Sequence, residues 1–294
     1  MWEPRVVGWL IGDGSYGFDK TPRLSNCDDE INEYIETHFD TALDRPVRLT
    51  KDGKTYKETR IKGICSKLRE LGIYGQVKDK KRLPLNIHEY DQESLAELMG
   101  GLFDTDGYLQ IDKSGRPRIT LTQCQEAILR QVEEVLIHFG VHCDIRFIKT
   151  KYREHVSNGR VIKDGPGHWR LTINDITSIG NFAKCISCAV AYKQSALDLM
   201  MLYTQEHVAQ YHKYVLGVHA EKIVNIEDIG EQDIYNLTAD EQHNYICNGI
   251  VTHNTGGTEG CLTAGNKVYT ANGIRKNIED ITINDGILGY DTKT

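Results

Sequence analysis

Two stretches of the chain share a pattern of apolar positions interrupted by glycine and closed by a carboxylate. The first is Val6-Val7-Gly8-Trp9-Leu10-Ile11-Gly12-Asp13-Gly14, and the second is Met99-Gly100-Gly101-Leu102-Phe103-Asp104-Thr105-Asp106-Gly107. Each pattern predicts an apolar helix. An interior glycine costs a helix about 1 kcal/mol relative to alanine, so two such helices indicate a close approach of their backbones. That packing would set Asp13 beside Asp106, and two carboxylates at one place repel each other unless a divalent cation lies between them.

The segments that follow the two stretches repeat one order of elements. After the first stretch the pattern predicts a strand, a helix, a hairpin and a short helix, at 21–25, 28–39, 45–62 and 64–71. After the second it predicts a strand, a helix, two basic strands and further helices, at 117–122, 126–139, 144–153, 169–173 and 176–191. This internal repeat predicts an α+β fold with two pseudo-symmetric αββαββα units, about 1–92 and 93–204.

Basic residues cluster in the predicted strands although the net charge is −7. A DNA contact needs local positive surface, which an acidic remainder does not forbid. A two-stranded ribbon of this kind fits the major groove of DNA, whereas the alternative is a solvated surface hairpin. The candidate DNA-binding residues are Arg48, Lys51, Lys54, Lys57, Arg60, Lys62, Arg146, Lys149, Lys151 and Arg153.

The two glycine-bearing stretches resemble the paired motif of the LAGLIDADG homing endonucleases. The first copy departs from the motif at several letters and the second is closer, while both keep the final Asp-Gly. The resemblance covers residues 1 to about 204 and implies a DNA-binding saddle that cuts both strands of duplex DNA at a long site, with Mg²⁺ bound by Asp13 and Asp106. It also implies a lysine near the scissile phosphate, which matches Lys81 in Lys81-Arg82-Leu83-Pro84, and Lys193 occupies a similar place in the second repeat although no proline follows it.

The tail from residue 221 changes to short predicted strands. The stretch Tyr235 to Thr255 resembles the C-terminal splicing blocks of an intein, in which a penultimate histidine and a terminal asparagine precede a host Ser, Thr or Cys. His253, Asn254 and Thr255 match in order, and His243 matches the upstream block histidine, whereas Asn236 stands where the family often has Asp. An asparagine amide can attack its own backbone carbonyl, and a neighbouring histidine can assist by proton transfer.

The remaining residues resemble an intein N-terminus that begins at Cys261, the candidate nucleophile after Gly260. The predicted order is therefore endonuclease 1–204, linker 205–220, C-terminal splicing half 221–254, host or linker segment 255–260, and N-terminal splicing half 261–294. An intein runs the other way round, and no Thr-x-x-His block follows Cys261. A fragment spanning two neighbouring inteins and a single permuted intein are the two explanations, and the first is the one we favour from the sequence. The splicing halves imply a partial all-β Hint domain and a host protein as partner.

The composition limits which other classes of protein and of site the chain could represent. Hydrophobic residues make up 39% and charged residues 26% of the chain, as in a globular protein, and no apolar run is long enough for a membrane span. The cysteines lie scattered in apolar segments, which favours reduced thiols and a cytoplasmic protein, and the pair in Cys185-Ile-Ser-Cys188 favours helical core cysteines over a zinc site. We expect a monomer. Two rival functions stay open: a DNA-binding module with a decayed nuclease site, and a self-processing protein with a passive endonuclease domain.

Overall fold

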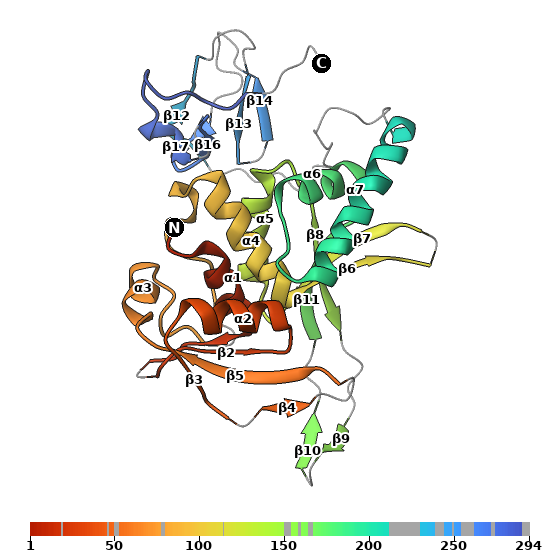
Figure 1. Cartoon of the computed structure of the whole chain (residues 1–294). Helices are drawn as coiled ribbons and strands as arrows, with labels where there is room; N and C mark the ends of the chain where they lie inside the picture. The colour runs from red at the N-terminus through yellow and green to blue at the C-terminus, as the bar shows by residue number, and fades with distance from the viewer. Residues whose placement is uncertain are drawn as a thin grey trace. The chain divides into compact units, whose positions relative to one another are not determined.

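The computed structural model of the chain consists of two compact units (Figure 1). The larger unit comprises residues 1–87 and 93–211, and the smaller comprises 88–92 and 212–294. No helix in the described part of the chain is long and apolar enough to cross a membrane. The structure describes residues 1–18, 20–45, 47–49, 53–77, 80–113, 115–149, 154–157, 160–163, 167–211, 230–238, 244–248, 250–253, 262–271 and 274–289, with side chains left out at 154–163, 208–211 and 253.

Both halves of the larger unit begin with a helix, two strands and a second helix and continue with further strands and a helix, which agrees with the repeat that the sequence predicts, although the second half has more strands and helices. The first half contains α1 (Pro4–Asp13), β1 (Gly14–Ser15), β2 (Arg23–Asn26), α2 (Asp29–His38), β3 (Thr41–Leu43), β4 (Arg48–Leu49), β5 (Thr55–Ile61) and α3 (Cys65–Glu70). The second contains α4 (Gln92–Asp106), β6 (Gly107–Ile111), β7 (Pro117–Gln123), α5 (Glu126–Ile137), β8 (Asp144–Lys149), β9 (Glu154–Ser157), β10 (Arg160–Lys163), β11 (Gly167–Ile173), α6 (Ile176–Cys185) and α7 (Ala191–Tyr211). A short 3-10 helix, η2 (Ile87–Glu89), lies between the halves.

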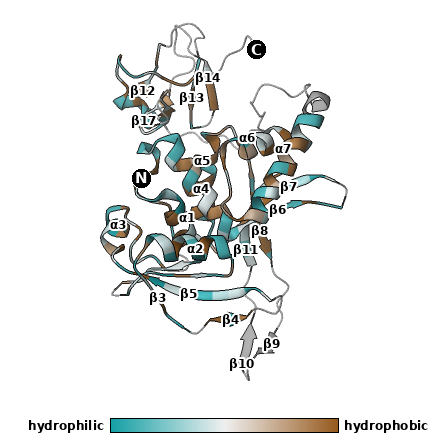
Figure 2. Ribbon diagram, in the orientation of Figure 1, coloured by the Kyte–Doolittle hydropathy of each residue, from teal (hydrophilic) through white to brown (hydrophobic). Residues whose placement is uncertain are grey.

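Each half builds one antiparallel sheet with the same strand order. The first sheet runs β1-β2-β5-β3, with β4 also paired to β5, and the second runs β6-β7-β11-β8. The registers correspond as well: Gly14 lies opposite Leu24 in the first sheet, and Gly107 lies opposite Leu121 in the second. This shared register fixes which residues of the two halves are equivalent. Strand β5 is drawn mostly in hydrophilic colours, in keeping with its exposed polar positions (Figure 2).

The two halves meet where α1 and α4 lie side by side (Figure 1). A methyl group built on Gly8 would lie 2.4 Å from the carbonyl oxygen of Leu98, and one built on Gly101 would lie 2.1 Å from that of Arg5. Both distances are far below van der Waals contact, and both neighbours are backbone atoms that cannot rotate away. The close approach inferred from the glycine pattern is therefore present, and it is the reason that the helices carry glycine.

The structure differs from the sequence prediction at several places in the larger unit. Strands β1, β3, β6, β9 and β10 were not predicted; β3 carries no alternating pattern of its own and is held by pairing with β5. The helices predicted at 176–191 are α6, which ends at Cys185, and α7, which begins at Ala191. Helix α7 then continues past 204, through the first part of the predicted linker, to Tyr211.

The described residues of the smaller unit form strands and one 3-10 helix. These are β12 (Ile234–Tyr235), β13 (Asn244–Cys247), β14 (Ile250–His253), β15 (Leu262–Thr263), β16 (Lys267–Tyr269), β17 (Arg275–Asn277) and η4 (Ile278–Asp280). Strand β12 pairs with β15, and the other sheet runs β14-β13-β16-β17. Strands from before and after residues 254–261 thus share both sheets. Their common core is Tyr245, Cys247, Val268 and Ile278.

The glycine contact gives a stability prediction. Gly8→Ala should lower the free energy of unfolding by about 2 kcal/mol or more, because its methyl group would meet the Leu98 carbonyl and force the helices apart. The matched control is Gly180→Ala in α6, where the methyl group would lie 3.3 Å from the side chain of Thr204 and alanine favours the helix. Urea unfolding measures both variants. Equal stability of Gly8→Ala and the wild type would contradict the close packing.

Candidate active site

Two carboxylates close the paired helices. Asp13 is the last residue of α1 and Asp106 is the last residue of α4. A methyl group built on Gly12 would lie 3.3 Å from Oδ2 of Asp106, so the end of one helix touches the carboxylate of the other. The structure therefore brings together the two site residues that the repeat predicted.

Each carboxylate is held by the amide side chain of an equivalent residue. Nδ2 of Asn26 donates a hydrogen bond of 2.7 Å to Oδ2 of Asp13, and Nε2 of Gln123 donates one of 2.6 Å to Oδ2 of Asp106. Asn26 ends β2 and Gln123 ends β7, each two residues after the leucine that lies opposite the motif glycine. Sequence reasoning missed both residues. An alignment of the two repeats would have shown an amide at the same place in each.

Burial and proximity perturb both carboxylates. Burial, and after it the neighbouring charge of Asp106, raises the pKa of Asp13 to about 6, while the hydrogen bond from Asn26 acts in the opposite direction. Burial likewise raises the pKa of Asp106, against the hydrogen bond from Gln123 and the charge of Lys81. Two ionised carboxylates at this place are thus unfavourable without a further positive charge.

The two predicted lysines lie at equivalent places, each at the carboxyl end of a motif helix. Nζ of Lys81 lies 2.7 Å from the carbonyl oxygen of Ile11 and 2.8 Å from that of Gly12. Nζ of Lys193 lies 2.9 Å from the carbonyl oxygen of Phe103, with further carbonyl contacts to Asp104 at 2.5 Å and Gly107 at 2.8 Å. Helix carboxyl ends leave carbonyls without intrahelical partners and carry partial negative charge, and an ammonium satisfies both. Burial lowers the pKa of each lysine.

A second buried aspartate in α4 fixes the surrounding elements and was not predicted. Asp104 is fully buried, and its Oδ2 accepts a hydrogen bond of 2.9 Å from Nε1 of Trp9 in α1. Its Oδ1 accepts from the backbone N–H of Ala189 at 2.9 Å and of Val190 at 3.3 Å, just before α7. Asp104 therefore ties both motif helices to the start of the helix that carries Lys193.

The donor set of the carboxylate pair suits a hard divalent cation. Magnesium takes oxygen ligands, keeps several waters, and is bound in proteins by one or two carboxylates. Each amide occupies one oxygen of its carboxylate, and within the described residues the other oxygen of each accepts no hydrogen bond. In the same part of the chain, no group of three or more His, Cys, Asp and Glu side chains forms a larger metal site.

Several candidate DNA-binding residues of the first half form ion pairs. Lys54 lies 2.9 Å from Asp28, Lys57 lies 2.8 Å from Glu36, and Lys62 lies 3.1 Å from Asp40. Two others stand on the predicted ribbon: Arg48 in β4 is exposed and lies opposite Tyr56, and Arg60 in β5 pairs with Asp44. In β8, Arg146 lies 3.0 Å from Asp144 and Lys149 is exposed. Outside the described residues lie Lys51, Lys151 and Arg153.

Most candidate splicing residues also lie outside the described part of the chain. These are His243, Asn254, Thr255 and Cys261. His253 is the last residue of β14, and its backbone pairs with Asn244 of β13. Their splicing roles stay predictions.

Comparison with known proteins identifies part of the chain. Residues 93–184 match the family model described as a LAGLIDADG-like domain. Among curated proteins, Protein RecA of Mycobacterium tuberculosis is 26% identical over 192 residues, covering 62% of this chain and 24% of that protein. The ATP-dependent DNA helicase Hel308 of Methanocaldococcus jannaschii is 30% identical over 199 residues, covering 65% of this chain and 16% of that protein.

The ribonucleoside-diphosphate reductase NrdEB subunit alpha of Bacillus subtilis matches along more of the chain. It is 28% identical over 274 residues, covering 85% of this chain and 24% of that protein. The chain thus spans about a quarter or less of the length of these relatives. Residues 93–184, which carry nearly all of α4 with Asp106 and Gln123, are the part of the chain that is similar to a LAGLIDADG-like domain.

Proposed function

We propose that the larger unit is a metal-dependent endonuclease that cuts both strands of duplex DNA at a long site. The observation that carries this proposal is the paired helix end: Asp13 and Asp106 meet there, and each is held by an amide from the equivalent strand. The symmetry of the two halves suits a substrate whose two strands are themselves related by an approximate twofold axis. The family of the matched domain supports the same substrate and reaction.

The residues of the site divide the work of phosphodiester hydrolysis. Asp13 and Asp106 would hold Mg²⁺, which when bound lowers the pKa of a coordinated water and offsets charge that develops on the phosphate. Asn26 and Gln123 orient the carboxylates so that each keeps one oxygen for the cation. Lys81 and Lys193 add positive charge at the helix ends, where their Nζ atoms bind backbone carbonyls. We therefore assign the lysines to positioning the carboxylates and to long-range stabilisation of phosphate charge.

The rival function is a DNA-binding module whose metal site has decayed. The arrangement of the carboxylates argues against it. A site under no demand for metal would not keep two carboxylates in a place where burial raises both of their pKa values. Here both are present, and both retain the amide that orients them.

We further propose that the smaller unit is a protein-splicing element that carries the endonuclease. RecA, a helicase and a reductase are different proteins, yet this chain matches each of them over no more than about a quarter of that protein's length. A segment shared by otherwise different proteins is typical of an inserted element. The predicted chemistry places Cys261 as the first nucleophile, His253 as the residue that polarises the carbonyl or protonates the leaving amine, Asn254 as the cyclising residue and Thr255 as the acceptor, with His243 as the upstream block histidine.

The strand pairing favours a single permuted element over two neighbouring ones. Strand β12 precedes residues 254–261 and pairs with β15, which follows them, and β13 pairs with β16 in the same way. The core of the unit likewise takes Tyr245 and Cys247 from one side and Val268 and Ile278 from the other. Two halves that belonged to different elements would have no reason to complete one core. This reverses the preference drawn from the sequence.

The first prediction concerns cleavage. Asp13→Asn and Asp106→Asn should each lower the rate of cleavage in Mg²⁺ by at least about a hundredfold, because a neutral amide is a poor ligand for magnesium. DNA binding measured by gel shift should persist. The assay uses a library of randomised duplex DNA, with the cut ends sequenced. The matched control is Asp198→Asn on the exposed side of α7, which should cut as the wild type does. Undiminished cleavage by either site variant would refute the two-carboxylate site.

A second prediction follows from the raised pKa of Asp13. The folded-state value of about 6 exceeds the usual value of 3.8, so ionisation of Asp13 disfavours the folded state above about pH 6, and this penalty vanishes below about pH 4. In EDTA at pH 8, Asp13→Asn should therefore have a Tm a few degrees above the wild type, with the difference disappearing near pH 4. Adding Mg²⁺ should raise the Tm of the wild type but not that of the variant. A variant that is less stable at pH 8, or that responds equally to Mg²⁺, would contradict this account.

A third prediction concerns the splicing element. The side-chain amide nitrogen of Asn254 would attack the main-chain carbonyl carbon of the same residue. This forms a succinimide, breaks the peptide bond to Thr255 and releases the amine of Thr255. We expect slow cleavage there at most and little release of a ring of residues 255–260, because no Thr-x-x-His block follows Cys261 to assist its acyl shift. Intact-mass measurement over days should show fragments 1–254 and 255–294, absent in Asn254→Ala. Accumulation of the ring would show instead that the Cys261 step works without the block.

The same experiment separates the two arrangements of the splicing halves. After cleavage, the two fragments should stay together in gel filtration and separate only in denaturant, because β12–β15 and β13–β16 hold them. Fragments that separate without denaturant would favour two neighbouring elements.

A further inference from the structure

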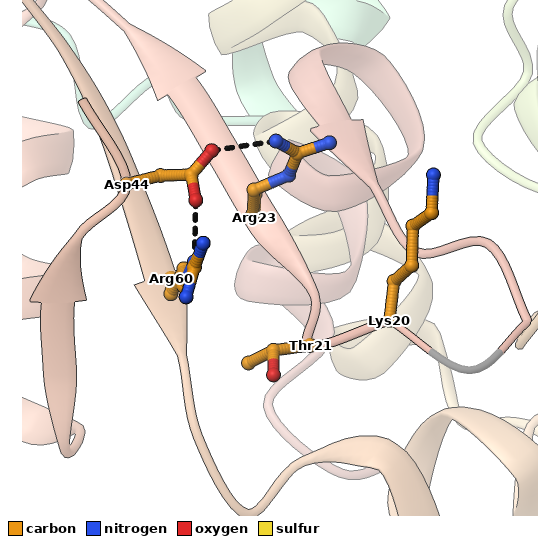
Figure 3. Close-up of a pocket in the computed structure, with 5 residues that line it drawn as sticks. All are labelled: Lys20, Thr21, Arg23, Asp44 and Arg60. Carbon is orange, nitrogen blue, oxygen red and sulfur yellow. Dashed lines mark hydrogen bonds and ion pairs between the residues drawn. The ribbon is translucent and has the colours of Figure 1, made fainter.

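The carboxylate of Asp44 lies between two arginines that stand on neighbouring strands of the first sheet (Figure 3). Nη1 of Arg23 in β2 lies 2.5 Å from Oδ2 of Asp44, and Nε of Arg60 in β5 binds the other oxygen, Oδ1. Arg23 and Arg60 lie directly opposite each other on neighbouring strands, so their side chains leave the same face of the sheet. They border a hollow of about 340 Å³, which is also lined by Lys20 and Thr21.

The bonds to Asp44 leave most N–H donors of the two guanidinium groups unused. The side chain of Asp44 is 5% exposed, whereas that of Arg60 is 53% exposed. Because Arg60 binds Asp44 through Nε, both of its terminal nitrogens remain for another acceptor. Arg23 uses only one terminal nitrogen for Asp44. The bonds to Asp44 orient both guanidinium groups before any ligand binds, whereas a surface lysine has no such fixed orientation.

The second half of the unit has different residues at the equivalent positions. The matching registers make Thr120 and Thr172 equivalent to Arg23 and Arg60, and these two threonines also lie opposite each other. By the same register, Arg146 stands where the first half has Asp44. The carboxylates, amides and lysines of the two halves correspond, but the arginine pair has no counterpart in the second half.

We propose that Arg60 and Arg23, positioned by Asp44, read a guanine in one half of the DNA target, and that the other half has no equivalent guanine contact. This inference rests on the proposed function. Guanine offers two acceptors, N7 and O6, in the major groove, and a single guanidinium reaches both with its two terminal nitrogens. A backbone phosphate fits less well, because it would approach the Asp44 carboxylate between the arginines. The guanidinium partners hold the pKa of that carboxyl below its usual value, so it stays ionised at neutral pH.

The experiment is a selection of bound sequences from a randomised duplex library in Ca²⁺, with the full-length protein and four variants. Wild type should enrich a non-palindromic site with guanine at one defined position. Arg60→Lys keeps the charge but loses the pair of terminal guanidinium nitrogens. Discrimination for guanine at that position should therefore fall about tenfold or more, with the other positions unchanged. Asp44→Asn keeps both guanidiniums but frees them, and it should relax the same position. Arg130→Lys is the matched control, since Arg130 also lies between two carboxylates, Glu126 and Glu133, on α5.

Each alternative has its own outcome. If Arg60→Lys enriches the wild-type site unchanged while Arg60→Ala only flattens the salt dependence of binding, the pair contacts phosphate and the inference fails. If Asp44→Asn alone leaves the preference unchanged, Asp44 is not a positioning residue. A wild type that binds duplex and selects a site while the variants match it refutes only this inference. A wild type that binds no duplex refutes the proposed function as well.

Discussion

The contact between α1 and α4 is the constraint on which the larger unit depends. Gly8 and Gly101 let the two backbones touch, and no side chain could replace them without moving main-chain atoms. The contact joins the two halves and at the same time sets the ends of both helices beside each other. The same two helices therefore provide both the packing between the halves and the pair of carboxylates. The carboxylates are held where their charges repel, and the amides and lysines offset part of that repulsion.

The repeat made much of this arrangement predictable from the sequence. Apolar periodicity, interior glycines and a closing carboxylate are local signals, so Asp13, Asp106 and the order of elements could be inferred from one chain. Asn26 and Gln123 could not, because an amide at a strand end has no distinctive local pattern and gains its meaning from the strand register. Asp104 and Asp44 were missed for the same reason. A carboxylate in a helix or after a short strand looks solvated until the elements around it are placed.

The smaller unit shows a different limit of sequence reading. Its motifs predicted two splicing halves in reversed order, and motif order alone could not say whether they belong together. That question is one of tertiary structure, because it depends on which strands pair. The pairing of β13 with both β14 and β16 joins the segments before and after residues 254–261 in one sheet. Segments that lie on opposite sides of residues 254–261 in the sequence thus belong to one folded unit.

The pleat of β2 has an evolutionary consequence. Leu24 and Asn26 lie on the buried face, where Asn26 holds Asp13, while Arg23 and Ser25 alternate with them on the other face. Substitutions at the accessible positions therefore leave the carboxylate geometry untouched, so the two faces of one strand can diverge at different rates. Insertion of a single residue would exchange the faces and disrupt both. The alternation of side chains along a strand of four residues thereby separates the carboxylate site from the accessible face of the sheet.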